Sequence, residues 1–164
     1  MSDLKVYMLG KFSMVYGEQP IIFKRNSATK VLKLLQILLH YSGVRGGISR
    51  NQLLEELYGR EDVSDAANNL RVTVHRLKKM LADTILPDYD YIQIESGIYR
   101  WKSPMTTWVD VIDFSEGVKA GEAETNEAER YRLFKKACLL YRGEFLPELS
   151  GEDWVIINSV AYKK

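Results

Sequence analysis

The amino-terminal segment alternates short runs of β-forming residues with glycine and proline. Residues 4–9 and 12–16 are rich in Val, Tyr, Met, Leu and Phe, and residues 21–23 form a third, shorter apolar run. Gly10 and the segment 17–20 interrupt these runs with residues that are typical of turns. The pattern predicts a small antiparallel sheet of three strands at the amino end.

The spacing of apolar residues then changes to the three- and four-residue intervals of helices. From Ser27, which can serve as an N-cap, the pattern predicts a buried first helix that Gly43 terminates. A second helix is predicted over 50–58, where Ser49 begins a capping box and Gly59 follows the last turn. Two consecutive helices of this length are typical of the support that a helix-turn-helix requires.

Residues 65–82 give the clearest helical pattern of the chain. Five apolar residues recur at intervals of 3, 4, 3 and 4 and therefore share one stripe of the helix, namely Ala67, Leu70, Val74, Leu77 and Leu81. After this helix, β-forming runs at 91–94 and 98–102 flank the turn residues 95–97, which predicts a hairpin. A sheet, three helices and a closing hairpin are the elements of a winged helix-turn-helix, an α+β fold.

Beyond Pro104 the character of the sequence is helical. Three further helices are predicted over 111–120, 126–141 and 153–162, and they suggest an all-α, tetratricopeptide-like segment, although no clean repeat is present. In the middle one, the apolar face consists of Ala128, Tyr131, Phe134, Cys138 and Tyr141. We therefore expect a winged-helix domain over 1–103 and a helical segment over 104–164, which we expect to be truncated from a longer protein.

The composition, with 46% hydrophobic and 27% charged residues, is typical of a globular protein. The sequence has no signal-peptide pattern and no long uninterrupted apolar run, so we expect a cytoplasmic protein with no membrane partner. Residues 1–108 hold 15 Lys and Arg against 11 Asp and Glu, whereas residues 109–164 hold 8 against 11. The single cysteine, Cys138, lies in an apolar helical setting and is expected to be a buried, unreactive thiol.

The third helix carries positive charge on the side opposite its apolar stripe. At 100° per residue that side contains Val72 among polar and basic residues, and no acidic residue occurs between Ala66 and Ala82. Arg and Asn can pair with base edges in a major groove, an exposed Val can touch a thymine methyl, and lysines contact phosphates. The candidate DNA-contacting residues of this face are Asn68, Arg71, Val72, His75, Arg76, Lys78 and Lys79. A merely solvated cationic face is the competing interpretation.

The predicted hairpin would act as the wing. Arg100 and Lys102 alternate with Tyr99 and Trp101, so the two basic side chains share one face of the strand. They could approach a phosphate backbone or minor groove while the aromatic rings cover the core. An ordinary hairpin that makes no DNA contact is the alternative.

Other function classes receive less support from the sequence. Neither His40 nor His75 has partners at metal-site or catalytic-triad spacing, so we expect no enzyme activity, no metal and no cofactor. His40 is expected at the end of the first helix, where it would cap carbonyls or pack. The main alternative function is a protein–protein interaction module, in which the winged helix and the helical segment bind partners without specific DNA binding. RNA is disfavoured, because its major groove is too narrow for a helix.

Two motifs in the sequence resemble those of a known family. Residues 69–81 and the Ser96-Gly97-Ile98-Tyr99-Arg100 segment resemble the recognition helix and wing of OmpR/PhoB-type DNA-binding domains. Residues 4–12, 109–114 and 137–143 are similar to the SARP-like transcriptional activators, in which a bacterial transcriptional activator domain of tetratricopeptide-like helices follows the winged helix. The resemblance implies a sequence-specific regulator that binds double-stranded DNA and activates transcription.

The resemblance also implies roles for individual residues. Arg76 would contact a base, with Val72 and Thr73 near bases, and the other basic residues of the helix would contact bases or phosphates. The loop before the third helix would contact RNA polymerase, and it comprises Arg60, Glu61, Asp62, Val63, Ser64 and Asp65. Self-association on repeated sites is a further expectation. Lys78 stands where Arg is common in the family, and a Lys is a point charge rather than a bidentate fork, so base contact at this position is less favoured. Ser96 replaces a more usual basic residue or glycine at the wing tip.

Overall fold

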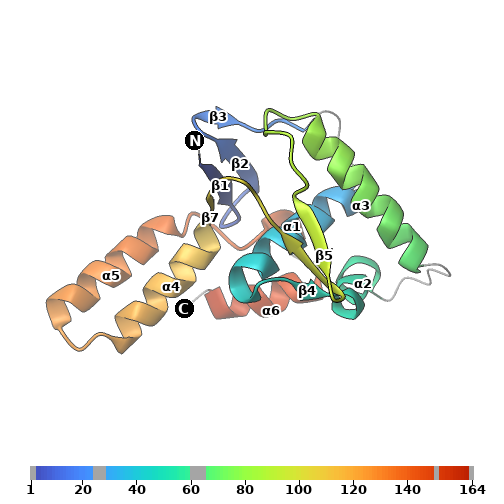
Figure 1. The fold of residues 1–164 in the computed structure, drawn as a ribbon. Coiled ribbons are helices and arrows are strands. Elements are labelled where there is room, and N and C mark those ends of the chain that lie inside the picture. The colour runs from blue at the N-terminus through green and yellow to red at the C-terminus, as the bar shows by residue number, and fades with distance from the viewer. Residues whose placement is uncertain (1–2, 24–28, 60–65, 150–151, 163–164) are drawn as a thin grey trace. The chain divides into compact units, whose positions relative to one another are not determined.

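A computed structural model describes residues 3–23, 29–59, 66–149 and 152–162, and Figure 1 shows its elements. The chain divides into two compact units, one comprising residues 18–106 and the other residues 3–17 together with 107–164. One division thus lies at 106/107, close to the expected end of the winged helix at 103. The first two strands, expected in the amino-terminal domain, are grouped with the second unit.

The first unit combines three helices with a small sheet. Its helices are α1 (Thr29–Arg45), α2 (Arg50–Tyr58) and α3 (Ala66–Ala82). Its antiparallel sheet has the order β4-β6-β5 and comprises β4 (Ile48–Ser49), β6 (Ile98–Trp101) and β5 (Ile92–Glu95), while the short β3 is Gln19–Pro20. The expected winged-helix architecture is therefore present, with an additional strand, β4, that the sequence pattern did not reveal.

Helix α1 forms the centre of the first unit's core. The leucines and isoleucine at 34, 35, 37, 38 and 39 are at most 2% exposed, and α1 contacts α2, α3, β4 and β6. The prediction that Gly43 ends this helix was wrong, because α1 continues to Arg45 and the positive φ occurs at Gly46 (78°). The amide of Gly46 donates to the Ser42 carbonyl at 3.1 Å, which closes the last turn.

The buried residues of α3 confirm most of its predicted apolar stripe. Leu70, Val74, Leu77 and Leu81 are buried, whereas Ala67 is exposed. The helical period places Ala67 on the same side of α3 as the buried residues. Ala67 is in the first turn of the helix, however, and a terminal turn can extend beyond the core against which the rest of the helix packs. Periodicity thus gave the direction of the stripe but not its length.

In the second unit, three neighbouring strands run in the order β2-β1-β7. β1 (Leu4–Tyr7) pairs antiparallel with β2 (Ser13–Tyr16) and parallel with β7 (Thr107–Val109), where Val6 faces Val109. The prediction of a strand at 21–23 was wrong, since these residues have no strand pairing. The sheet obtains its further strand from the distant residues 107–109.

Three α-helices complete the second unit, as the sequence predicted, and the described residues also include a short 3-10 helix, η1 (Pro147–Leu149). They are α4 (Asp110–Ala123), α5 (Glu127–Leu140) and α6 (Asp153–Tyr162). α4 and α5 pack closely because Gly117 and Gly121 lie at their contact, where a Cβ on Gly121 would lie 2.5 Å from the Phe134 ring. None of the helices described is long and apolar enough to cross a membrane.

The expected burial of Cys138 was wrong, because its side chain is exposed. Ala137 is the buried residue of α5, and Tyr131, on the predicted apolar face, is 68% exposed. The contact with α4 is made through Ala137 and Phe134, and Cys138 lies about 100° further round the helix than Ala137. A pair of helices covers only one side of each helix, so an apolar residue on another side stays exposed.

Candidate nucleic-acid interface

Helix α2 supports α3 through buried contacts. Ser49 caps α2 by accepting a hydrogen bond from the Gln52 amide at 3.3 Å, as predicted, and the helix ends at Gly59, whose φ is 51°. The hydroxyl oxygens of Tyr58, at the last turn of α2, and Thr73 of α3 lie 3.2 Å apart. Thr73 also donates to the Asn69 carbonyl at 2.7 Å.

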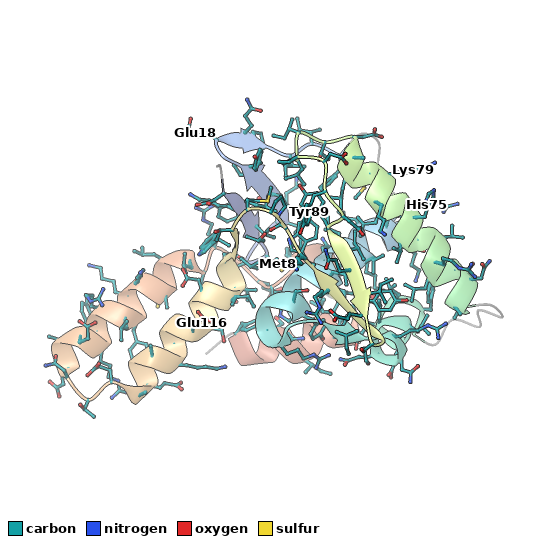
Figure 2. The ribbon with its side chains drawn as sticks, viewed as in Figure 1. Met8, Glu18, His75, Lys79, Tyr89 and Glu116 are labelled. Carbon is teal, nitrogen blue, oxygen red and sulfur yellow. The ribbon has the colours of Figure 1, made fainter. Side chains whose placement is uncertain are left out.

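The Thr73 side chain lies on the inner side of α3, where it is 8% exposed. The remaining candidates on this helix are all exposed, namely Asn68, Arg71, Val72, His75, Arg76, Lys78 and Lys79. Val72 is 40% exposed, so an apolar side chain does lie within the polar face. In Figure 2, His75 and Lys79 project from the side of α3 that faces away from the wing strands.

The exposed side of α3 presents a concentration of positive charge. Within the described parts of the chain, Arg71, Arg76 and Lys79 make no ion pair, whereas the Nζ of Lys78 lies 3.2 Å from the Oδ1 of Asp90. Most of these cations are therefore available to an external anion. An array of phosphates is the anion that matches a helix face of this length and charge.

The wing is a tight hairpin with its aromatic side buried. Ser96 and Gly97 both have positive φ, 53° and 76°, as a two-residue type I′ turn requires. Tyr99 and Trp101 are each 8% exposed, and the Trp101 ring stacks on that of Tyr91 at 4.8 Å between centroids. The expected alternation of the wing is thus confirmed.

The two basic wing residues differ in their surroundings. Arg100 is half-buried opposite Gln93, and its guanidinium lies 4.0 Å from the Glu95 carboxylate. Lys102 is exposed. Lys102 is therefore more available to an external anion than Arg100.

The wing is attached to the helices by features that sequence reasoning missed. Strand β4 pairs with β6, so that Ile48 faces Tyr99, and the amide of Arg50 donates to the Gly97 carbonyl at 3.0 Å. Gly47, with φ 141°, allows this approach, because a Cβ there would lie 2.8 Å from the Tyr99 carbonyl oxygen. The adjacent glycines 46 and 47 were the available signal for such a close backbone contact.

The expected loop of contact with RNA polymerase, residues 60–65, lies outside the described residues. The described residues include no group of three or more His, Cys, Asp or Glu side chains that could hold a metal ion. His40 is within α1 rather than at its end and is 0% exposed, and its burial, followed by the nearby Arg45 charge, lowers its pKa to about 3. This histidine is a neutral core residue.

Comparisons with known proteins agree with this geometry. Residues 26–98 match the family described as "Transcriptional regulatory protein, C terminal". A solved structure of Mycobacterium tuberculosis EmbR in complex with a low-affinity phosphopeptide is similar in fold, with a TM-score of 0.72 and 19% sequence identity. The likeness covers 98% of this chain and 42% of the EmbR chain, so this chain spans less than half of that protein's length.

No curated protein matches the chain. The family match includes α1, α2, α3 and the wing as far as its turn, which are the elements that carry the exposed cationic face. Residues 26–98 are therefore similar to the transcriptional regulatory protein C-terminal family, and the elements described within this range have the winged helix-turn-helix arrangement.

Proposed function

We propose that the chain is a sequence-specific DNA-binding transcriptional regulator. In this proposal α3 enters the major groove and the wing contacts the neighbouring backbone or minor groove. The observation that carries it is the exposed face of α3, which bears four Lys and Arg side chains and no acidic residue and is held in place by α2. We assign the chain no catalytic role, in line with the regulatory family that residues 26–98 match.

Each exposed residue of α3 has a role that fits its chemistry. Arg76 and Arg71 present planar guanidinium groups that can pair bidentately with guanine, and Val72 can contact a thymine methyl. Lys78 and Lys79 lie toward the end of the helix, where point charges hold phosphates. Asn68 and His75 complete the polar contacts.

Thr73 has a different role from the one implied by the resemblance. Its buried hydroxyl joins Tyr58 to α3 and so sets the position of the helix. In the wing, Lys102 supplies the accessible charge, with Arg100 beside it. Activation through an RNA polymerase contact by residues 60–65, and self-association on repeated sites, are parts of the proposal that rest on the resemblance.

A second candidate function is a protein-interaction module. It is favoured by the exposed apolar side chains of α5, where Tyr131 is 68% and Leu139 is 74% exposed. Such residues commonly mark sites of contact with other proteins. DNA binding and protein binding are compatible, because the cationic residues are on α3 and the exposed apolar residues are on α5.

The decisive experiment selects binding sites from random duplex DNA with the purified chain. Binding of the selected site is then measured for Arg76→Ala and Val72→Ala across several salt concentrations. We expect a defined sequence motif, a loss of about 1–3 kcal/mol with Arg76→Ala and relaxed discrimination at the base pair that Arg76 contacts. Affinity should fall steeply with salt, because phosphate contacts release counterions.

Matched controls come from the chain itself. Arg132→Ala removes an exposed arginine from α5, and Val44→Ala removes an exposed valine from α1, and neither should change the selected motif. Absence of any motif, with affinities that do not respond to salt, would exclude specific DNA reading and favour the interaction module.

A further inference from the structure

We propose that Asp90 acts as an internal competitor of DNA for Lys78, and that it thereby lowers the chain's affinity for DNA of any sequence. The inference rests on the proposed function, because it concerns a phosphate-contacting residue of α3. It assigns a role in setting the affinity for DNA to an acidic residue outside the cationic face.

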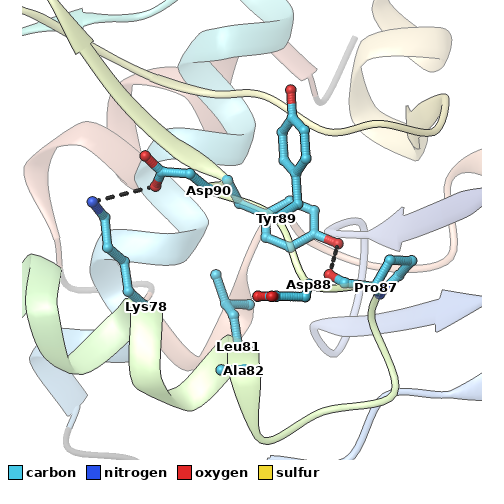
Figure 3. Close-up of a pocket in the computed structure, with 8 residues that line it drawn as sticks. Lys78, Leu81, Ala82, Pro87, Asp88, Tyr89 and Asp90 are labelled. Atoms are coloured by element: carbon cyan, nitrogen blue, oxygen red, sulfur yellow. Dashed lines mark hydrogen bonds and ion pairs between the residues drawn. The ribbon is translucent and has the colours of Figure 1, made fainter.

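The ion pair joins α3 to the segment that precedes β5 in the first unit. The Lys78 Nζ and the Asp90 Oδ1 lie 3.2 Å apart, and the two side chains are 43% and 62% exposed. Figure 3 shows Lys78 reaching from α3 toward Asp90 at the edge of a hollow of about 420 Å³, which is also lined by Leu81, Pro87 and Tyr89. The carboxylate thus lies beside the carboxyl-terminal half of the proposed recognition helix.

The backbone around Asp90 is held in place by its neighbours. The Tyr91 hydroxyl donates to the Pro87 carbonyl at 2.6 Å, and the Lys102 amide donates to the Tyr91 carbonyl at 2.8 Å. The Tyr91 ring is stacked on Trp101 in the wing. Asp90 is therefore presented to Lys78 from an anchored segment.

The arrangement divides the cations of α3 into two classes. Arg71 and Arg76, which can read bases, have no ion-pair partner among the described residues, whereas Lys78, a candidate for phosphate contact, has one. A phosphate that approaches Lys78 competes with Asp90 for its ammonium group, and the Asp90 carboxylate remains close to the DNA. Both effects act on backbone contacts, which carry no sequence information, so they lower the affinity for specific and nonspecific DNA alike and leave base recognition unchanged.

The chain offers a matched control in Asp88. It lines the same hollow, is exposed, and makes no ion pair within the described residues, so Asp88→Asn removes an equal charge from the same region. A purely general electrostatic effect would change affinity equally in Asp90→Asn and Asp88→Asn. An effect of the ion pair would be larger for Asp90 and would require Lys78.

The test measures binding of fluorescent duplexes by anisotropy for the wild type, Asp90→Asn, Asp88→Asn, Lys78→Gln and the Lys78→Gln/Asp90→Asn double variant. One duplex carries the selected site and the other has a scrambled sequence. We expect Asp90→Asn to tighten binding of both duplexes about two- to fivefold, as suits an exposed ion pair, and Asp88→Asn to have a smaller effect. In the Lys78→Gln background the effect of Asp90→Asn should fall to that of Asp88→Asn.

Two results would count against the inference and separate it from the proposed function. Equal effects of Asp90→Asn and Asp88→Asn, or an undiminished Asp90→Asn effect without Lys78, would overturn the competition while leaving DNA binding intact. Failure of the wild type to bind either duplex would overturn the proposed function and this inference with it. Thermal unfolding of each variant checks that the substitutions leave the fold unchanged.

Discussion

The two compact units each bury a titratable side chain, but they accommodate it in different ways. In the first unit His40 is 0% exposed, and its ring packs edge-on against that of Tyr41 with 4.8 Å between the ring centroids. Burial lowers the pKa of His40 to about 3. In the second unit Asp110 is 1% exposed and accepts hydrogen bonds from the amides of Met8, Leu9 and Val111 at 2.8, 3.0 and 2.7 Å. One unit thus excludes a charge from its core, and the other surrounds a carboxylate with donors.

This difference gives the two units opposite responses to pH. The folded pKa of His40 is below its unfolded value of 6.5, so its contribution to stability is present above that value and is lost as the pH falls. Burial raises the pKa of Asp110 above 3.8, although its three amide donors and Arg142 oppose the shift. The folded second unit therefore binds the Asp110 proton more strongly than the unfolded chain, and stability declines as the pH rises from 3.8 through the raised pKa. Acid should weaken the first unit while it favours protonated Asp110 in the second.

The largest expected effect comes from removing the carboxylate of Asp110. Asp110→Ala leaves three buried amides without their acceptor, so the unfolding free energy of the second unit should fall by about 3 kcal/mol or more. Hydrogen exchange of the Met8 and Leu9 amides measures this directly, because both should lose protection. Figure 2 marks Met8 and also Glu116, an exposed residue of the same helix as Asp110.

Glu116→Ala is accordingly the matched control for Asp110→Ala. It removes a carboxylate from α4 without removing an acceptor from a buried amide, and it should leave exchange at Met8 and Leu9 unchanged. Equal protection in Asp110→Ala and the wild type would mean that these amides do not depend on the carboxylate.

Much of the first unit could be predicted from local sequence. Helix α3 and the wing were found because the 3.6-residue and two-residue periods fix which side chains share a face, and the exposed candidates of α3 follow from that geometry. The turn at Ser96 and Gly97 followed from turn-forming residues. These features depend on neighbours in the chain.

The features that were missed depend on distant neighbours. β7 has only three residues, and it becomes a strand by pairing with β1, whose residues lie about a hundred positions away in the sequence. The Lys78–Asp90 ion pair joins α3 to an irregular segment before β5, whose position no periodic pattern specifies. The exposure of Cys138 depends on which side of α5 the glycines of α4 contact. In each case tertiary contacts decided the outcome.

The next largest effect concerns the acid response of the first unit. Between pH 7.5 and pH 5 the unfolded chain protonates His40 and the folded unit does not, so stability should fall by about 2 kcal/mol. In His40→Leu this part of the decline should disappear. Urea unfolding at each pH, with amide exchange in α1 as the local probe, measures the difference.

His75 provides the comparison for His40, since it is an exposed histidine of the same unit. His75→Gln should retain the wild-type pH profile. A His40→Leu profile that is identical to that of the wild type would show that His40 does not cause the decline.

The smallest expected effect concerns Arg142, whose charge acts on the buried carboxylate of Asp110. The Arg142 guanidinium lies 5.1 Å from the centre of the Tyr7 ring, and its charge lowers the pKa of Asp110. Arg142→Gln removes both interactions, so at neutral pH the second unit should lose about 0.5–1 kcal/mol. Below the pKa of Asp110 only the loss of the contact with Tyr7 should remain, so the destabilisation should shrink in acid.

Urea unfolding at neutral and acidic pH tests this prediction for Arg142→Gln, with Arg132→Gln on α5 as the control for removal of an exposed arginine. A destabilisation that is the same at both pH values would mean that Arg142 acts through Tyr7 alone, and that the three amides are sufficient to hold the Asp110 carboxylate.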